Sequence, residues 1–193
     1  DNTHPSAVRI VRENYLLRHD AAYSKISNHN TKLGHPDMKR RMILAFMIDR
    51  PGVLNKIAML IRRKMYNVDT LTVCSTHKPG VSRMTITLRE DDDAKVVQII
   101  RQIEKFTEVI RAKELNREKS YWREVAIVKF ELDKKALNKL RKTYQLELLD
   151  SQPNDTHIVQ IAGRTETINQ FLEDITKDQV IEIARTGVTA MDK

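Results

Sequence analysis

The chain of 193 residues suits one large domain or two small ones, and 40% hydrophobic with 31% charged residues is ordinary for a globular protein. It has no run of eighteen apolar residues, so no membrane-spanning helix is expected. A net charge of +8 raises the question of an acidic partner such as nucleic acid, and the single cysteine, Cys74, excludes an internal disulfide and is expected to pack in a strand.

Residues 1–38 are predicted to form a basic N-terminal extension. Residues 6–26 carry enough apolar positions for one amphipathic helix, and residues 27–37 are rich in turn-forming residues. Half of the net charge belongs to this end, because residues 1–41 hold eight basic and four acidic side chains. We expect a helical or flexible arm that docks on a partner, with a disordered extension of no role as the alternative.

The pattern from residue 41 onward predicts the order β-α-β-β-α-β. Short apolar or alternating runs indicate strands, and apolar residues at a spacing of three and four indicate helices. The predicted strands cover residues 41–49, 68–76, 81–88 and 107–115, and the predicted helices cover residues 52–66 and 91–106. Two apolar helix faces are expected: Val53, Leu54, Ile57, Leu60, Ile61 and Met65 on the first helix, and Val96, Val97, Ile100 and Ile103 on the second.

The same order returns after a short charged linker, residues 116–121, so the sequence contains an internal structural repeat. Strands are predicted over residues 122–132, 145–151, 156–163 and 180–191, and helices over residues 133–144 and 165–176, with Thr165 as the cap of the last helix.

The fold class that follows is α+β: two tandem ferredoxin-like βαββαβ domains, residues 39–116 and 117–193, behind the extension. Each domain is expected to hold a four-stranded antiparallel sheet with two helices on one face. The other face of each sheet then needs cover from another sheet or chain.

The turn at residues 49–52, Asp-Arg-Pro-Gly, joins the first strand to the first helix. The start of a helix presents unpaired amide groups and a positive dipole end, which attract a carboxylate. Gly52 lets a ligand approach these amides, Pro51 stiffens the turn, and Asp49 can accept hydrogen bonds from an ammonium group. The site therefore suits a free amino acid, with a purely structural tight turn as the alternative. The equivalent turn in the repeat lacks glycine and proline and is not expected to bind in the same way.

Four stretches carry a resemblance to a known family: RPGVLNKIAMLIRRKMYNVDTLTV, KPGVSRMTITL, REVAIVKFEL and IEIARTG. Over residues 40–190 the chain resembles the small regulatory subunit of acetohydroxyacid synthase, or acetolactate synthase, which begins with an ACT domain. The resemblance implies a non-catalytic subunit for branched-chain amino acid biosynthesis that holds no cofactor. It implies binding to, and activation of, a catalytic large subunit that carries thiamine diphosphate, Mg and FAD. It also implies allosteric feedback inhibition by valine, and in some members by leucine or isoleucine.

The resemblance also implies where the effector binds. In the family, ACT domains of two chains pair edge to edge, and the effector lies at the interface of this homodimer. One chain supplies the strand-to-helix loop and the other supplies an asparagine at the start of the second strand. The matching residues are Asp49, Arg50, Pro51, Gly52, Val53 and Leu54 in the loop, and Asn67 and Val68 at the strand. This sequence departs from the family at Asp49, where asparagine is common, and at Met65, where glycine is usual. We therefore expect altered effector affinity or selectivity and a different exit from the helix.

Other functions would require features that can be sought in the same sequence. A stand-alone ACT-domain amino-acid sensor remains an alternative. A basic nucleic-acid-binding module shares the βαββαβ order, but residues 81–88 lack the aromatic side chains that stack on bases, so no nucleic-acid partner is expected. An enzyme would need a paired nucleophile and base, and the histidines show no metal-ligand spacing, so neither a catalytic site nor a metal site is predicted. We expect a cytoplasmic protein without membrane contact, with a plastid or mitochondrial location as the alternative for a processed eukaryotic form.

Overall fold

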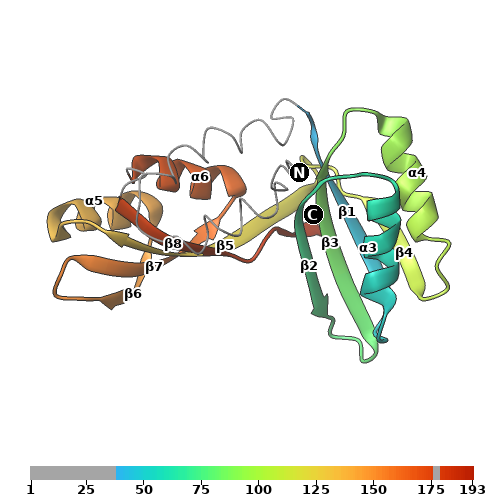
Figure 1. Cartoon of the computed structure of the whole chain (residues 1–193), viewed down its shortest axis with the longest axis horizontal. Helices are drawn as coiled ribbons and strands as arrows, with labels where there is room; N and C mark the ends of the chain where they lie inside the picture. Colours follow the sequence, from blue (N-terminus) through green and yellow to red (C-terminus); the bar gives the residue numbers. More distant parts are fainter. Residues whose placement is uncertain (1–37, 176–178) are drawn as a thin grey trace, which may run out of the picture. The chain divides into compact units, whose positions relative to one another are not determined.

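The computed structural model of the protein describes residues 38–175 and 179–193 (Figure 1). The predicted N-terminal extension lies outside the described residues, apart from Met38. Residues Met38–Lys193 form one unit that holds two sheets.

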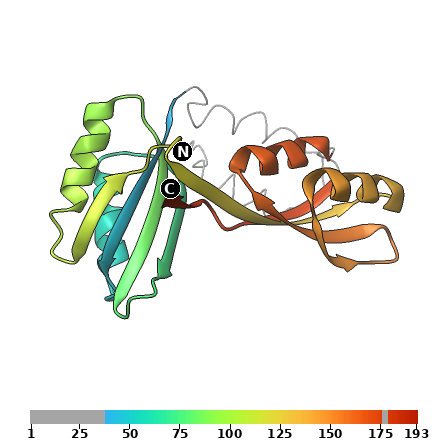
Figure 2. The same ribbon diagram turned by 180° about the vertical axis from the view of Figure 1, so that it is seen from behind.

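The N-terminal sheet has the predicted order of elements. Its elements are β1 (Arg40–Ile48), α3 (Val53–Arg63), β2 (Val68–Ser75), β3 (Val81–Arg89), α4 (Asp93–Ile103) and β4 (Val109–Glu114). The strands are antiparallel in the spatial order β2-β3-β1-β4, which leaves β2 and β4 at the edges. Both helices cover the same face of this sheet (Figures 1 and 2). The prediction of a βαββαβ unit is therefore confirmed.

The continuous apolar run of β1 is explained by burial on both faces of the sheet. Ile43 and Ala45 point into the core under α3 and α4, whereas Met42 and Leu44 belong to a second apolar cluster on the opposite face. A strand that is covered on both sides loses the alternation of apolar and polar residues that half-buried strands show.

The C-terminal sheet repeats this arrangement. Its elements are β5 (Ser120–Glu131), α5 (Lys134–Tyr144), β6 (Glu147–Ser151), β7 (Thr156–Gly163), α6 (Thr165–Asp174), β8 (Val180–Arg185) and β9 (Thr189–Asp192). Four strands follow the order β6-β7-β5-β8, and β9 pairs separately with the start of β5. Phe130 and Phe171 lie at the centre of its core. The expected second unit of an α+β fold is thus present.

The last predicted strand, residues 180–191, is wrong as a single element. It is divided into β8 and β9 at Thr186–Val188, where Gly187 has φ of 77°. The left-handed conformation of Gly187 interrupts the strand and redirects the chain, so that β9 pairs with Ser120–Arg123 of β5. Residues typical of strands stand on both sides of Gly187, and so the break was not evident from the pattern.

Three further side chains differ from the predictions. Thr165 does not cap α6: its hydroxyl instead donates a hydrogen bond to Glu124 Oε2 (3.1 Å), and Arg164 occupies the cap position. On α4 the buried face contains Val96, Ile99 and Ile103, whereas Val97 is 44% exposed. Cys74 lies in β2 as expected, but its side chain is exposed.

The sheet face opposite α3 and α4 is covered in part by the chain's own C-terminal segment. Val188 and Ala190 pack with Met42, Leu44 and Leu115, and all of these residues are buried. The prediction called for another sheet or another chain on this face, whereas a segment of the same chain supplies part of the cover. None of the helices within the described ranges is long and apolar enough to cross a membrane.

Candidate effector site

The loop between β1 and α3 is held at both sides by backbone hydrogen bonds. Asp49 N–H donates to Gly80 O (2.9 Å), and Ile48 N–H donates to Glu108 O (2.8 Å). Gly52 has φ of 87°, a left-handed conformation that residues with a side chain adopt only with strain. A Cβ atom built at Gly52 would have no atom within 4 Å, so the space beside this turn is open to a ligand.

The first turn of α3 presents backbone amides without a side-chain cap. Gly52 occupies the cap position, and among the described residues no side chain accepts a hydrogen bond from this helix end. The first turn also contains no acidic residue. Two other helix starts show the contrast: Asp92 accepts from Ala94 N–H on α4, and Asp133 accepts from Lys135 and Ala136 N–H on α5. A free carboxylate can therefore bind at α3, whereas the repeat's α5 already carries its own carboxylate.

A groove of about 510 Å³ runs along α3 beside the edge strand β2. It is lined by Leu54, Ile57, Ala58, Ile61, Arg62, Met65, Tyr66, Asn67, Val68, Leu71 and Met84. The lining is mostly apolar, with Arg62 as its charged member. Three of the predicted site residues, Leu54, Asn67 and Val68, line this groove. Leu71 was missed by the sequence reasoning, although its position at an edge strand with an apolar side chain on the helix face was a usable signal.

The remaining predicted residues lie around the start of α3 and not in the groove. Asp49, Arg50, Pro51 and Gly52 are exposed in the loop. Val53 is buried in the core and is 3% exposed, so only its backbone can face a ligand.

The exit from α3 keeps the geometry that glycine favours, which corrects the expectation of a different exit. Met65 itself takes the left-handed conformation, with φ of 59°, and its side chain is 87% exposed. Tyr66 then packs against the core, and its hydroxyl donates to Lys95 O (3.3 Å). Burial raises the pKa of Tyr66, so this hydroxyl stays protonated as the donor. The chain thus delivers Asn67 to the start of β2.

The loop and Asn67 lie at opposite ends of α3. This helix has 11 residues, which corresponds to about 16 Å of length. A free amino acid is far shorter than this, so it cannot contact the Gly52 turn and Asn67 of the same chain together. β2 is an edge strand of its sheet, a position that allows pairing with a strand of a second copy.

Comparison with known proteins agrees with the fold. Residues 43–111 match the family model for the AHAS small subunit-like ACT domain, and residues 123–193 match that for the small subunit of acetolactate synthase. The chain is 33% identical over 156 residues to the probable acetolactate synthase small subunit of Methanothermobacter thermautotrophicus, covering 79% of this chain and 92% of that protein. It is 29% identical to the acetolactate synthase small subunit of Bacillus subtilis, over 78% of this chain and 89% of that one.

A solved structure is similar over nearly its whole length. The crystal structure of the acetolactate synthase small subunit from Thermotoga maritima has a TM-score of 0.75 and 29% identity, and the match covers 81% of this chain and 98% of that chain. The resemblance seen in the sequence is therefore confirmed by two family models, by related sequences and by a related fold. The chain belongs to the acetolactate synthase small subunit family.

Proposed function

We propose that this chain is the regulatory subunit of an acetolactate synthase and is not itself catalytic. It binds a thiamine-diphosphate-dependent catalytic subunit, raises its activity, and inhibits it when valine or a related amino acid accumulates. Thiamine diphosphate, Mg and FAD belong to the catalytic partner in this proposal.

The observation that carries the proposal is the placement of the two halves of the site. The uncapped start of α3 and the amide side chain of Asn67 lie at opposite ends of one helix, and an exposed edge strand runs beside them. Two copies that pair through β2 complete two equivalent sites. An amino acid that binds there contacts both chains, so its binding depends on how the two chains of the dimer are arranged.

Each part of a branched-chain amino acid has a partner in such a site. The carboxylate accepts hydrogen bonds from the first-turn amides of α3, and its charge is favoured by the helix dipole. The ammonium group donates to Asp49, and Asn67 of the other copy bridges from the opposite side. Leu54 and Val68 supply an apolar wall for the side chain. Because one methylene changes binding by only about 1–3 kcal/mol, valine, leucine and isoleucine should compete.

Inhibition follows if the effector-bound dimer favours an inactive arrangement of the catalytic subunit. A ligand shifts such an equilibrium only by the difference in its affinity for the two arrangements. An effector between two chains has this property, because its contacts exist only when both chains are correctly placed.

The test is a calorimetric titration of the purified chain with valine, leucine and isoleucine, followed by reconstitution with the catalytic subunit. Asn67→Ala should weaken valine binding by about tenfold or more, the loss of about 1.4 kcal/mol from hydrogen bonds to a charged group. The matched control is Asn154→Ala, because Asn154 is exposed in a turn of the C-terminal domain.

Two results would contradict parts of the proposal. Wild-type affinity in Asn67→Ala would remove Asn67 from the site. Effector binding without any effect on the catalytic subunit would instead indicate a stand-alone ACT-domain sensor.

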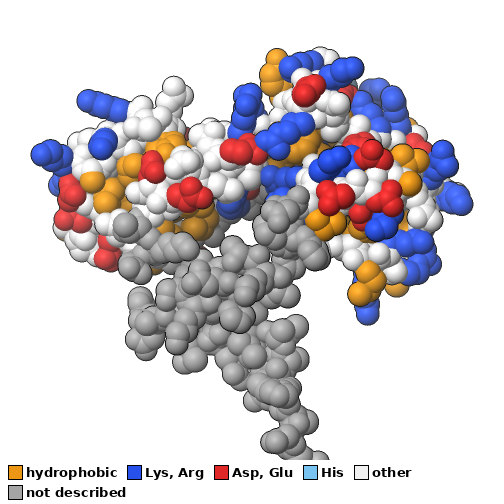
Figure 3. Space-filling model, turned by 90° about the horizontal axis from the view of Figure 1, so that it is seen from above, with side chains coloured by type: hydrophobic (Ala, Val, Ile, Leu, Met, Phe, Trp, Pro, Cys, Tyr) orange, Lys and Arg blue, Asp and Glu red, His pale blue; other side chains and the backbone are white. Residues whose placement is uncertain are grey.

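The charge distribution supports the absence of a nucleic-acid partner in this proposal. On the face shown in Figure 3, Lys and Arg side chains alternate with acidic ones and form no continuous basic surface. Nucleic-acid binding depends on such a surface and weakens steeply with salt. We expect no RNA binding at physiological ionic strength, and submicromolar affinity in a filter assay would contradict this.

A further inference from the structure

The last part of the chain, Thr186–Asp192, forms a strap between the two sheets, and we call this segment the C-terminal strap. Its first residue is fixed to the C-terminal sheet. Thr186 N–H donates to Val125 O (3.0 Å), and Thr186 Oγ1 accepts from Val125 N–H (3.1 Å). Val125 belongs to β5, the strand that pairs with both β7 and β8. The strap therefore begins at the centre of the C-terminal sheet.

The next residues of the strap are bonded to β2 of the N-terminal sheet. Thr72 Oγ1 donates to Thr186 O (3.3 Å), and Val188 N–H donates to Thr70 Oγ1 (3.4 Å). The Thr70 hydroxyl also shares a hydrogen bond with the Thr87 hydroxyl (2.6 Å) on β3. Asn67 lies directly before β2, so the strap contacts the same strand that carries half of the candidate effector site.

Gly187 leaves no free space at this joint. It has φ of 77°, and a Cβ atom built on it would lie 3.0 Å from Thr72 Oγ1 and 3.1 Å from Thr70 Cβ. Any displacement of β2 toward the strap must therefore move the strap, because close-packed contacts transmit displacement and do not absorb it.

The rest of the strap is packed on the open face of the N-terminal sheet. Val188 and Ala190 are 0% and 4% exposed, and Trp122 of β5 packs against the same cluster. Lys113 of β4 forms an ion pair with Asp192 at the end of the strap. Because β9 also pairs with Ser120–Arg123, a movement of the strap reaches β5 at two places.

We propose that the C-terminal strap couples the effector site to the C-terminal domain. This inference rests on the proposed function and deepens it, since it names the path by which occupancy at Asn67 reaches the second domain. Effector binding at the start of β2 shifts Thr70 and Thr72. The strap moves with them, because Gly187 is in close contact with both, and the movement of the strap displaces β5. The physical requirement is a strap with two arrangements whose balance the effector changes.

Trp122 is the only tryptophan of the chain, so its emission reports on the docking of the strap. Valine titrated into the wild-type chain should change Trp122 emission with the midpoint found by calorimetry. No valine binding in calorimetry would overturn the effector site and, with it, the coupling. Bound valine without any change in emission would overturn the strap alone.

Two variants test the coupling in the reconstituted enzyme. Gly187→Ala brings a Cβ against Thr70 and Thr72, and Thr72→Val removes one hydrogen bond without adding bulk. Both should retain valine binding by the regulatory chain within about threefold while the valine concentration for half inhibition rises by about tenfold, the scale of a typical coupling energy. Stimulation of the catalytic subunit without valine should stay at the wild-type level.

The matched control is Thr143→Val. The Thr143 hydroxyl donates a hydrogen bond to Lys139 O (3.1 Å) on α5, so this change also removes one threonine hydrogen bond, but one that involves neither β2 nor the C-terminal strap. The variant should be inhibited as the wild type is. Inhibition with the wild-type midpoint in both Gly187→Ala and Thr72→Val would overturn the proposal.

Discussion

Two residues with left-handed backbone enclose α3, Gly52 before it and Met65 after it. The glycine and its turn were evident from the sequence, because Pro and Gly between an apolar strand and an amphipathic helix predict such a turn. The conformation of Met65 was not evident, since a methionine usually avoids positive φ. Tertiary packing decides it: Tyr66, the next residue, is drawn to the core, and this offsets the cost of about 1 kcal/mol at Met65.

Gly52→Ala tests the role of the open space at the helix start. We expect unfolding to become easier by about 1 kcal/mol because alanine is strained at φ of 87°. We also expect valine binding to fall by at least about tenfold, because the added Cβ would occupy the space proposed for the valine carboxylate. Chemical denaturation and calorimetry measure the two effects. Gly187→Ala, at φ of 77°, should also lose stability but with valine binding retained, and equal loss of binding in both variants would argue against the site.

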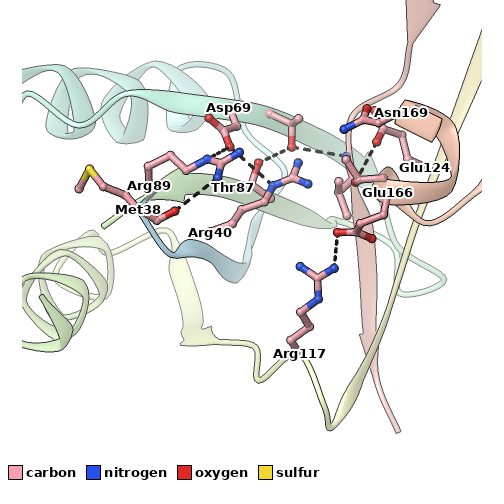
Figure 4. A network of polar contacts seen from close by, with 12 residues as sticks. Met38, Arg40, Asp69, Thr87, Arg89, Arg117, Glu124, Glu166 and Asn169 are labelled. Atoms are coloured by element: carbon pink, nitrogen blue, oxygen red, sulfur yellow. Dashed lines mark hydrogen bonds and ion pairs between the residues drawn. The ribbon is translucent and has the colours of Figure 1, made fainter. Parts of the chain in front are cut away.

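Glu124 is a buried carboxylate whose negative charge is balanced by the guanidinium group of Arg185. Its side chain is 2% exposed, and it accepts hydrogen bonds from Arg185 Nε (2.7 Å), Arg185 Nη2 (2.9 Å) and Thr165 Oγ1 (3.1 Å). Burial by itself raises the pKa of Glu124, but the hydrogen bonds and charge of Arg185 outweigh it and hold the pKa below the ordinary 4.5. Figure 4 shows Glu124 beside Glu166 and Arg40, a polar network that lies between the two sheets.

The lowered pKa makes this contribution to stability depend on pH. A carboxylate with a depressed folded-state pKa stabilises the fold above its unfolded-state pKa, and this stabilisation is lost as the pH falls through the folded-state value. Glu124→Gln should therefore cost about 2 kcal/mol at neutral pH, and the difference from wild type should shrink below pH 4.5. Urea unfolding over a pH series measures it, with exposed Glu118→Gln as the control. A difference that is constant with pH would contradict the assignment.

At the scale of elements, helix boundaries and types followed from periodicity, but the rotation of α4 did not. The predicted apolar face included Val97, which is exposed, and left out Ile99, which is buried, whereas Ile100 packs against the core as predicted. Apolar residues at 96, 97, 99, 100 and 103 allow two overlapping stripes on this helix. Only the position of the sheet below decides between them.

This rotation can be tested by two substitutions on the same helix. Ile99→Ala should destabilise the protein by about 2–5 kcal/mol, because the Ile99 side chain is only 1% exposed and its truncation leaves a cavity in the core. Val97→Ala should change stability by less than about 0.5 kcal/mol, because Val97 is 44% exposed. Equilibrium unfolding in urea gives both values. Equal costs would show that α4 is rotated differently.

At the scale of the whole molecule, the edge strand β2 is where a second copy is expected. Leu71 is 41% exposed beside the groove, and Val73 on the same strand is equally exposed. Exposed apolar side chains on a strand edge favour pairing with another strand edge. The proposed dimer would bury them together with the groove.

Leu71→Glu should weaken this dimer by at least about tenfold, since a charge buried at an interface without a partner is costly. Sedimentation velocity over a concentration series measures the dissociation constant. Val97→Glu is the matched control, because it adds the same charge at a similarly exposed position on α4. If both variants dimerise as the wild type does, β2 is not the interface.

The sequence by itself determined the fold class, the internal repeat and the family, because strand and helix periods, turn residues and the motifs around Gly52 are local properties of the chain. It also placed the glycine turn and Asn67 at the two ends of one helix. Tertiary structure alone decided the rotation of α4, the left-handed Met65 and the division of the last strand at Gly187. These features depend on contacts between residues far apart in the chain: Gly187 is a break and not a strand residue because Thr70 and Thr72 of β2 lie against it. Such contacts leave no period in the sequence, since each partner alone fits an ordinary strand.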